Sequence, residues 1–387
     1  MTNNIENLGQ VFTPENIVDL MIDMIQNEGK ILEPSCGDGA FSTKLLDRNL
    51  LAVEIDPSCC PDHALVMDFF DLSVDNKFDT IIGNPPYVAY KNICDKTRAK
   101  LNDTNYDKRT NLFIYFIDKC LEHLKPGGEL IFVTPREFIK QTSAIFLNNL
   151  LHKSGTLTHF YDYGDKMLFK GFTPNCAVWR FEKDNHTHIT QLLDKSTTTQ
   201  QNINGQLIFS DTLYDYNFSD IFSVHVGGVS GLDSIFVHPN GNKEFVYSQT
   251  ATTGKTRQMY YNTKDPYLVL HKSKLINRKI KTFNENNWWQ WGRDFHKSKA
   301  ERIYVNCKTR KKEPFFTHSC KNYDGSVLAI IPTKPGIDIP KAVKLLNCID
   351  WGELGFKVGG RLVFAQKPLQ NIKLPKDKVD KILLKEN

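Results

Sequence analysis

Short apolar runs alternate with amphipathic helical patterns along the first 185 residues, and this alternation limits the folds that the chain can adopt. The runs that predict β-strands span residues 30–33, 50–56, 64–70, 78–83, 129–133, 156–163 and 176–181, and helical patterns span 14–25, 40–48 and 111–124. We expect Thr13 to cap the first helix and Pro14 to begin it. Strands that alternate with helices predict an α/β fold, in which helices cover both faces of a largely parallel sheet.

Ligands of such sheets bind at the carboxyl ends of the strands. The first strand ends in the turn Glu33-Pro34-Ser35-Cys36-Gly37-Asp38-Gly39, where two glycines let the backbone approach a ligand. A Gly-x-Gly pair alone is equally typical of an ordinary turn. Glu54 ends the next strand, 21 residues after Glu33, where an acid that binds ribose hydroxyls is expected. Asp68 and Phe69 end the third strand and suit an adenine amino group and an adenine ring.

Three strand ends with these residue types predict a nucleoside-binding site. The third glycine of the dinucleotide fingerprint is absent, which fits a ligand without a pyrophosphate. We predict S-adenosylmethionine as the cofactor. A nicotinamide dinucleotide is the alternative that these strand ends leave open.

The tetrapeptide Asn84-Pro85-Pro86-Tyr87 follows the fourth strand and favours S-adenosylmethionine. The methyl acceptor that this tetrapeptide fits is the amino nitrogen of an adenine. That nitrogen is a poor nucleophile because its lone pair is delocalised into the ring. The Asn84 side chain and the Pro85 backbone each offer a carbonyl that can accept one of its hydrogens, and the prolines fix φ so that both carbonyls are held in place. Tyr87 can stack on the base. The competing interpretation is a plain Asn-Pro turn.

A methyl group on a sulfonium needs no metal for its transfer, and the nine cysteines include no Cys-x-x-Cys pair that would predict one. A base inside a duplex cannot reach such a site, so the target base must be flipped out and held by stacking. We expect Phe169 to provide the second stacking face. Phe172 is its competitor, and core packing is the alternative role for either ring.

These motifs, in this order, resemble the gamma-class adenine-N6 methyltransferases of bacterial restriction-modification systems. The resemblance covers residues 9–183 and also includes Gly9-Gln10-Val11-Phe12-Thr13-Pro14, Asn111-Leu112-Phe113 and Lys125-Pro126-Gly127-Gly128. It implies a class I S-adenosylmethionine-dependent methyltransferase fold, a Rossmann-like seven-stranded sheet whose last strand is antiparallel. The cofactor-binding residues implied are Phe12, Thr13, Pro14, Glu33, Pro34, Ser35, Cys36, Gly37, Glu54, Ile55, Asp68, Phe69 and Asn84, and the catalytic residues implied are Asn84, Pro85, Pro86, Tyr87 and Phe169.

The sequence pattern changes beyond residue 190. The tract 196–204 is polar and low in complexity, so we expect a linker or an exposed loop there. The resemblance implies a catalytic, cofactor-binding domain over residues 1–190 and a mixed α/β target-recognition domain that binds DNA over residues 191–387. Residues 228–233 and 357–364 resemble segments of such recognition domains.

Positive charge is concentrated between residues 251 and 312. This segment carries 16 Lys and Arg against 4 Asp and Glu, a net charge of +12, which leaves −7 for the rest because the whole chain carries +5. The segment predicts a module that binds polyanions, although a solvated lysine-rich surface fits the charge equally well. The resemblance implies that the polyanion is double-stranded DNA. We expect Trp288, Trp289 and Trp291 to pack in the interior rather than stack on bases. The loop 90–110, which carries six Lys and Arg, is predicted to lie near DNA and to become ordered on binding.

The tetrapeptide alone also fits methylation of a protein glutamine amide or of ribosomal RNA. The Phe12-Thr13-Pro14 motif before the sheet and the basic part after it favour DNA. A DNA-binding module without catalytic activity is disfavoured because the tetrapeptide is intact. A fused nuclease is also disfavoured, because the catalytic and recognition parts use the length of the chain. The N-terminus lacks a signal pattern and no apolar run approaches the roughly 20 residues that span a bilayer. We therefore expect a cytoplasmic protein that does not bind membranes. We also expect a monomer, and a cognate restriction endonuclease that acts separately is a candidate partner.

Overall fold

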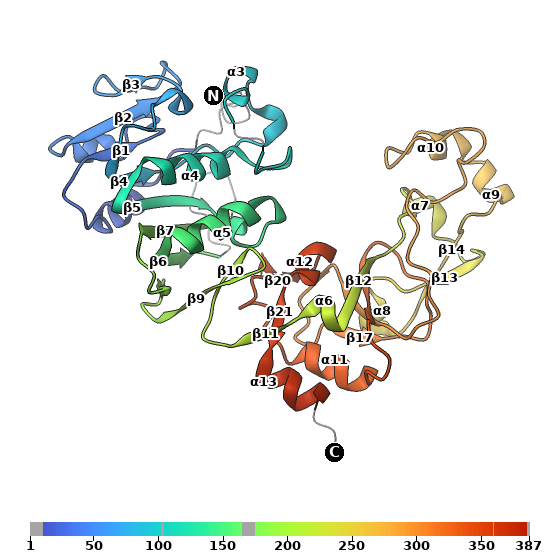
Figure 1. The fold of residues 1–387 in the computed structure, drawn as a ribbon. Helices are drawn as coiled ribbons and strands as arrows, with labels where there is room; N and C mark the ends of the chain where they lie inside the picture. The colour runs from blue at the N-terminus through green and yellow to red at the C-terminus, as the bar shows by residue number, and fades with distance from the viewer. Residues whose placement is uncertain (1–10, 102–103, 165–174, 359, 385–387) are drawn as a thin grey trace. The chain divides into compact units, whose positions relative to one another are not determined.

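The computed structural model of the protein describes residues 11–101, 104–164, 175–358 and 360–384. The chain divides into two compact units, Met1–Asp211 and Thr212–Asn387 (Figure 1). The predicted boundary after residue 190 is therefore too early. Residues 189–209, including the predicted linker, form three strands that complete the sheet of the first unit.

The first unit is built on one ten-stranded sheet, in the order β10-β9-β8-β6-β7-β5-β4-β1-β2-β3. Its strands are β1 (Ile31–Glu33), β2 (Leu50–Glu54), β3 (Leu65–Val66), β4 (Phe78–Gly83), β5 (Leu124–Pro135), β6 (Gly155–Asp162), β7 (Cys176–Lys183), β8 (Ile189–Leu192), β9 (Thr197–Ile203) and β10 (Gln206–Phe209). Neighbours from β3 to β5 run parallel. Strand β7 is antiparallel to both β5 and β6. The seven-stranded sheet with an antiparallel last strand is confirmed, and β8 to β10 extend it.

The helices of the first unit differ in part from the predicted ones. The α-helices are α2 (Glu15–Asp23), α3 (Asp95–Arg98), α4 (Leu112–His123) and α5 (Ile145–Ser154), and the 3-10 helices are η1 (Ser42–Leu45), η2 (Phe69–Asp71), η3 (Tyr90–Asn92), η4 (Arg136–Ile139) and η5 (Thr142–Ala144). The helix predicted over 40–48 is wrong. The backbone forms hydrogen bonds from Lys44 N to Phe41 O and from Arg48 N to Leu45 O, and this i→i−3 pattern makes a tighter turn than an α-helix.

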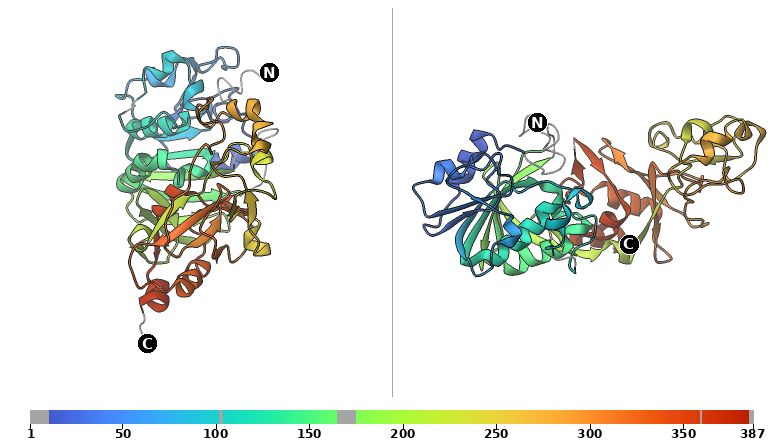
Figure 2. Two further views of the ribbon diagram at one scale, coloured as in Figure 1. Left: turned by 90° about the vertical axis from the view of Figure 1, so that its right-hand side faces the viewer. Right: turned by 90° about the horizontal axis from the view of Figure 1, so that it is seen from above.

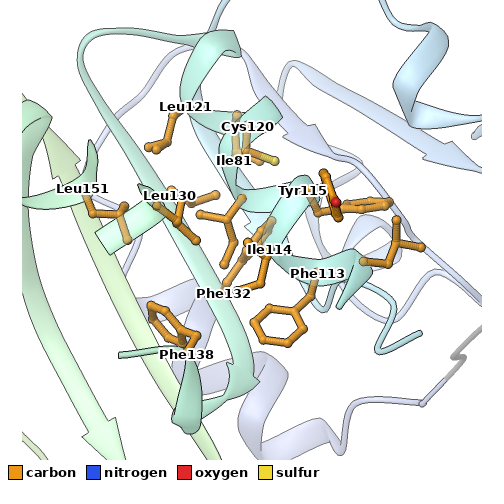
Figure 3. Packing of buried hydrophobic residues seen from close by; sticks show 14 of the residues in the cluster. Ile81, Phe113, Ile114, Tyr115, Cys120, Leu121, Leu130, Phe132, Phe138 and Leu151 are labelled. Carbon is orange, nitrogen blue, oxygen red and sulfur yellow. The ribbon is translucent and has the colours of Figure 1, made fainter. Parts of the chain in front are cut away.

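Consecutive residues of the central strands face opposite sides of the sheet, and helices cover both sides (Figure 2). On one side, Ile81 of β4 and Phe132 of β5 pack against α4 (Figure 3). On the other side, Ile82 and Val133 of the same strands pack with residues of α2. This burial of both faces explains why the central strands read as continuous apolar runs. Because β1 to β5 run parallel, their carboxyl ends lie at a common edge of the sheet.

The second unit is a mixed α/β structure made of small sheets and short helices. Its strands are β11 (Tyr214–Asn217), β12 (Phe222–Val226), β13 (Lys243–Phe245), β14 (Arg257–Met259), β15 (Ile303–Asn306), β16 (Lys308–Thr309), β17 (Phe315–Thr317), β18 (Val327–Pro332), β19 (Lys357–Val358), β20 (Arg361–Val363) and β21 (Lys373–Pro375). Its helices are α6 (Phe218–Ile221), α7 (Asp233–Phe236), α8 (Thr250–Thr253), α9 (Pro266–Val269), α10 (Lys272–Ile276), α11 (Ile339–Asn347), α12 (Gln366–Gln370), α13 (Lys376–Val379) and the π-helical turn η6 (Asp380–Leu384).

An antiparallel sheet in the order β12-β18-β15-β17 lies at the centre of the second unit. Aromatic side chains form much of the core next to it. Trp288 and Trp291 are buried there, which confirms the packing role predicted for these two rings. Trp289 packs against the same core but is only partly buried. Among the described residues, no helix is long and apolar enough to cross a membrane.

Candidate active site

A pocket of about 120 Å³ opens in the first unit where β1, β2, β3 and β4 end. Its lining includes most of the predicted cofactor-binding residues, namely Phe12, Thr13, Glu33, Pro34, Ser35, Cys36, Gly37, Glu54, Ile55, Asp68, Phe69 and Asn84. Pro86 also lines the pocket, whereas Pro14, Pro85 and Tyr87 are not among its lining residues. The position predicted for the second stacking ring, Phe169, lies outside the described residues.

The turn after β1 places its backbone at the pocket because two glycines adopt conformations that side chains disfavour. Gly37 has φ +56° and lines the pocket, and Gly39 has φ +87°. A Cβ atom at Gly39 would also lie 2.8 Å from Pro61 Cγ. Both positions therefore need glycine for their backbone conformation. At Gly39 the packing against Pro61 adds a second reason, which the sequence pattern alone did not reveal.

Glu54 binds the backbone of that turn from the end of β2. Its Oε2 accepts from Gly37 N at 2.8 Å, and its Oε1 accepts from Asp56 N at 2.9 Å. The side chain is almost fully buried, so these two bonds define its orientation. A carboxylate oxygen has more than one acceptor site, so Glu54 can hold the turn and still accept from two hydroxyls of a ribose.

Asp68 lies at the end of β3, where it caps η2 by accepting from Phe70 N at 3.1 Å through Oδ1. Its Oδ2 accepts from Thr97 Oγ1 at 2.8 Å and from Lys100 Nζ at 2.9 Å. Phe69, which follows it, is buried and packs against Phe116 of α4 with ring centroids 5.1 Å apart. Both residues line the pocket, as the sequence predicts, and the carboxylate is held there by three donors.

Glu33 is the acid of the pocket whose pKa is shifted most. Its side chain is 1% exposed, and Oε2 has no hydrogen-bond partner among the described residues. Burial raises the pKa of the Glu33 carboxyl to about 8, which is the direction expected when a charge is moved out of water without a compensating cation. A buried acid with one free oxygen is therefore ready to bind a cationic group of a ligand.

The side-chain amide of Asn84 is held at its nitrogen and, among the residues that the structure describes, has no partner at its oxygen. Its Nδ2 donates to Val11 O at 2.9 Å and to Thr13 Oγ1 at 3.1 Å, so the orientation of the amide is set by two acceptors. Its Oδ1 is buried and has no hydrogen-bond partner in the described part of the chain. The prediction that Thr13 caps α2 is wrong. Pro14 occupies the N-cap position without any side-chain cap, and the Thr13 hydroxyl binds Asn84 instead.

The rest of the tetrapeptide is anchored to the sheet. Ser35 Oγ donates to Asn84 O at 3.2 Å, which ties the tetrapeptide to the turn after β1. Tyr87 Oη donates to Val133 O at 2.8 Å, and its ring meets Phe113 of α4 edge-on. Burial raises the pKa of Tyr87, so the phenol stays protonated and acts as a donor. The ring is thus held near the pocket without lining it.

Several residues of the pocket wall had no sequence signal. Ile93, Cys94 and Thr97 follow the tetrapeptide within the segment that was expected to be an irregular loop. That segment contains η3 and α3. Leu112 and Phe116 line the pocket from α4. Their spacing predicted a helix face, but an apolar face indicates only burial, and whether it faces a core or a ligand depends on the fold.

Part of this unit is similar to a known protein family. Residues 43–169 match the model of the Eco57I restriction-modification methylase family, so the predicted resemblance is confirmed over this segment. The Type II methyltransferase M.HincII of Haemophilus influenzae is 33% identical over 187 residues, which are 46% of this chain and 37% of that protein. The Type II methyltransferase M.TthHB8I of Thermus thermophilus is 30% identical over 196 residues, which are 46% of this chain and 45% of that protein. The chain therefore matches less than half of the length of these relatives.

One similar solved structure spans both units. It is that of the Type IIL restriction-modification enzyme MmeI in complex with DNA. The likeness covers 95% of this chain and 64% of MmeI, with a TM-score of 0.63 and 12% sequence identity. At this identity the likeness shows the fold, which includes the class I methyltransferase sheet of the first unit and extends over the second.

Proposed function

We propose that the protein is a site-specific DNA methyltransferase of a restriction-modification system, which transfers a methyl group from S-adenosylmethionine to N6 of a flipped-out adenine. The first unit would be its catalytic domain and the second unit its target-recognition domain. The relatives that match 46% of the chain are named Type II methyltransferases, which supports a DNA substrate. MmeI, which resembles both units, was solved in complex with DNA. Such a protein would act in the cytoplasm, where bacterial DNA lies.

The free Oδ1 atom of Asn84 is the observation that carries this proposal. Because Nδ2 is bound by Val11 O and Thr13 Oγ1, the carbonyl end of the amide is directed away from those partners and is available to a ligand. A buried acceptor without a donor is costly, so its persistence is typical of a functional site. A hydrogen of an adenine amino group would satisfy it. That hydrogen bond would draw the nitrogen lone pair out of the ring.

The acids of the pocket fit the parts of S-adenosylmethionine. Glu54 would accept from the ribose hydroxyls, and Asp68 with Phe69 would bind the adenine. Glu33, with its unpaired buried oxygen, would bind the amino group of the methionine part. When bound, the cofactor supplies a methyl group that its sulfonium has already activated, so the chain needs to position and orient the acceptor rather than form a covalent intermediate.

The target base would lie against Tyr87, whose ring is held by its bond to Val133 O and by Phe113. Removing a base from a duplex costs stacking energy that aromatic contacts in the enzyme must restore. The Pro85 backbone carbonyl is the second acceptor that we assign to the amino group, and Phe169 is the second stacking ring. Both assignments follow from the order of the motifs in the sequence.

Sequencing of methylated bases in DNA from cells that express the full chain would test the proposed substrate. We expect N6-methyladenine at one short recognition sequence. Unmodified DNA together with new methylation of ribosomal RNA or of a release-factor glutamine would assign the protein to one of the alternative acceptors. The presence of a separate cognate endonuclease would be tested by challenging the same DNA with extracts of the source cells.

Replacing Asn84 tests the mechanism. Asn84→Ala should lower the rate of methyl transfer by about 10²–10³-fold, the usual cost of removing one preorganised hydrogen-bonding group from a catalytic site. Binding of S-adenosylhomocysteine, measured by calorimetry, should change little. The matched control is Asn92→Ala, because Asn92 is an exposed asparagine a short distance along the same segment. Methyl transfer at the unaltered rate in Asn84→Ala would refute the mechanism.

A further inference from the structure

The segment that follows the tetrapeptide returns to the pocket and forms one of its walls. We call residues 93–101 the α3 segment. Its residues Ile93, Thr97 and Leu101 are buried, and Ile93 and Leu101 belong to the main core of the first unit. Ile93, Cys94 and Thr97 line the pocket together with Asp68 and Phe69. The α3 segment thus meets the strand end that we assign to the adenine of the cofactor.

Two side chains of the α3 segment bind one oxygen of Asp68. Thr97 Oγ1 donates to Asp68 Oδ2 at 2.8 Å, and Lys100 Nζ lies 2.9 Å from the same atom. The Asp68 side chain is 7% exposed and that of Lys100 is 21% exposed, so water screens this ion pair much less than a surface pair. Lys100 also pairs with Asp71 at 2.6 Å, which fixes the ammonium between two carboxylates.

This arrangement sets which way the Asp68 carboxylate faces. A buried carboxylate needs hydrogen bonds and a counter-charge, and it turns toward whatever supplies them. With Oδ2 held by Thr97 and Lys100, the plane of the carboxylate is fixed. The remaining acceptor sites can then meet the amino group of an adenine at a constant angle. Without Lys100, the buried charge would have to be neutralised or turned toward another donor.

We propose that Lys100 and Thr97 are positioning residues for the adenine end of the cofactor, and that they act through Asp68. The inference rests on the proposed function, because it takes an adenosyl cofactor as the ligand of the pocket. Neither side chain has to touch the cofactor for this role. Lys100 would therefore serve cofactor selection rather than DNA binding.

The first test measures S-adenosylhomocysteine binding to the full chain by calorimetry. Lys100→Met should raise the dissociation constant at least about tenfold, the scale expected when a hydrogen bond to a charged group is lost. Lys96→Met is the matched control, because Lys96 is exposed and lies one helical turn before Lys100 on the same segment. Lys100→Arg should recover part of the affinity, since it keeps the charge.

A second ligand separates positioning from a general loss of structure. S-inosylhomocysteine carries a ring carbonyl in place of the adenine amino group, so it has no donor at the position that we assign to Asp68. The wild-type protein should prefer the adenosyl ligand, and Lys100→Met should lose most of that preference. If both ligands weakened equally, or if neither weakened, the positioning role would be wrong. If the wild-type protein bound neither ligand, the proposed function itself would fail.

The thiol of Cys94 provides a test that needs no substitution. Cys94 is exposed, and its Sγ lies 3.3 Å from Thr97 Oγ1. An adenosyl ligand bound beside the α3 segment should slow the alkylation of Cys94 by iodoacetamide, measured by mass spectrometry of its peptide. The exposed Cys348 of the second unit is the control and should react at an unchanged rate. Equal rates at Cys94 with and without saturating S-adenosylhomocysteine would also overturn the inference.

Discussion

At the scale of single residues, the pocket is defined by polar atoms that the fold buries and leaves without partners. Glu33 Oε2 and Asn84 Oδ1 are both of this kind within the described part of the chain. Such atoms reduce stability, because their hydration is lost and no protein donor replaces it. The two atoms lie in one pocket, and each matches a different part of the proposed reaction: the cationic end of the cofactor and the amino group of the target base.

The raised pKa of Glu33, about 8, predicts that cofactor binding releases a proton. In the ligand-free protein the carboxyl stays protonated at pH 7. A cationic amino group placed beside it lowers the pKa and displaces the proton. Affinity for S-adenosylhomocysteine should therefore increase as the pH rises toward 8. Calorimetry in buffers of different ionisation enthalpy would count the protons. Glu33→Gln should abolish the release, whereas the exposed control Glu28→Gln should retain it.

The same pKa has a consequence for the stability of the ligand-free protein. Because burial raises the folded-state pKa of Glu33 from 4.5 to about 8, the folded state binds more protons than the unfolded state between these values. As far as this group is concerned, the folded state is therefore most stable below pH 4.5, and its stability falls as the pH rises to about 8 because the buried carboxyl must then lose its proton. If cofactor binding released as many protons from Glu33→Gln as from the wild-type protein, Glu33 would not be the group that releases the proton. The dependence of stability on pH that we assign to Glu33 would then be wrong as well.

At the scale of elements, a buried ion pair links strand β7 to its neighbour β5. Arg180 Nη2 lies 2.8 Å from Glu129 Oε2, and the two side chains are 3% and 0% exposed. Glu129 of β5 also accepts from Thr80 Oγ1 of β4 and from the backbone N–H groups of Gln26 and Asn27, just beyond α2. The carboxylate therefore connects two strands and the end of a helix, and it depends on Arg180 for charge compensation.

Removing that compensation should destabilise the sheet strongly. Arg180→Met should lower the free energy of unfolding of the first unit by about 3–5 kcal/mol, because it leaves a buried charge unpaired. Hydrogen exchange of peptides from β5 and β7 across a urea series would measure the loss. Lys44→Met, which removes the exposed pair of Lys44 with Asp19, is the control and should change the midpoint far less. Similar shifts for both variants would show that the buried pair has no special role.

At the scale of the whole molecule, the excess of positive charge in the second unit divides into two kinds of residue. Arg278 and Arg302 are buried, and Arg278 donates to Leu275 O and Gln290 O, so these cations support the fold. Lys308, Arg310 and Arg361 are exposed and form no ion pair among the described residues. They lie on or next to the small sheet of β16, β20 and β19.

These exposed cations predict how salt should affect DNA binding. If Arg310 and Arg361 bind phosphates, replacing both with Gln should reduce the slope of log K against log salt concentration by about two, one for each phosphate that is no longer neutralised. Filter binding or fluorescence anisotropy from low to moderate salt would measure the slope. Lys341→Gln is the control, because Lys341 is exposed on α11 of the same unit. An unchanged slope in the double variant would exclude this sheet from the DNA interface.

Local sequence pattern was sufficient for the parts of the fold that depend on near neighbours. The apolar runs of β1, β2 and β4 and the helical spacing of α4 predicted these elements, and the residues at the strand ends predicted the pocket. The polar strand β9 was expected to be a linker. Its Thr and Gln residues become a strand only because β8 and β10 pair with them, since strand preference depends more on pairing and burial than on composition.

The sequence alone therefore determined the α/β class, the order of the motifs and the identity of the acids and the asparagine at the strand ends. The tertiary structure decided which of these atoms are held and which remain free. Thr13 binds Asn84 across 71 residues, and Thr97 and Lys100 bind Asp68 across 29 and 32 residues. No local pattern encodes such contacts, because the chain segments between them are free to take many paths until the sheet forms and brings its carboxyl ends to one edge.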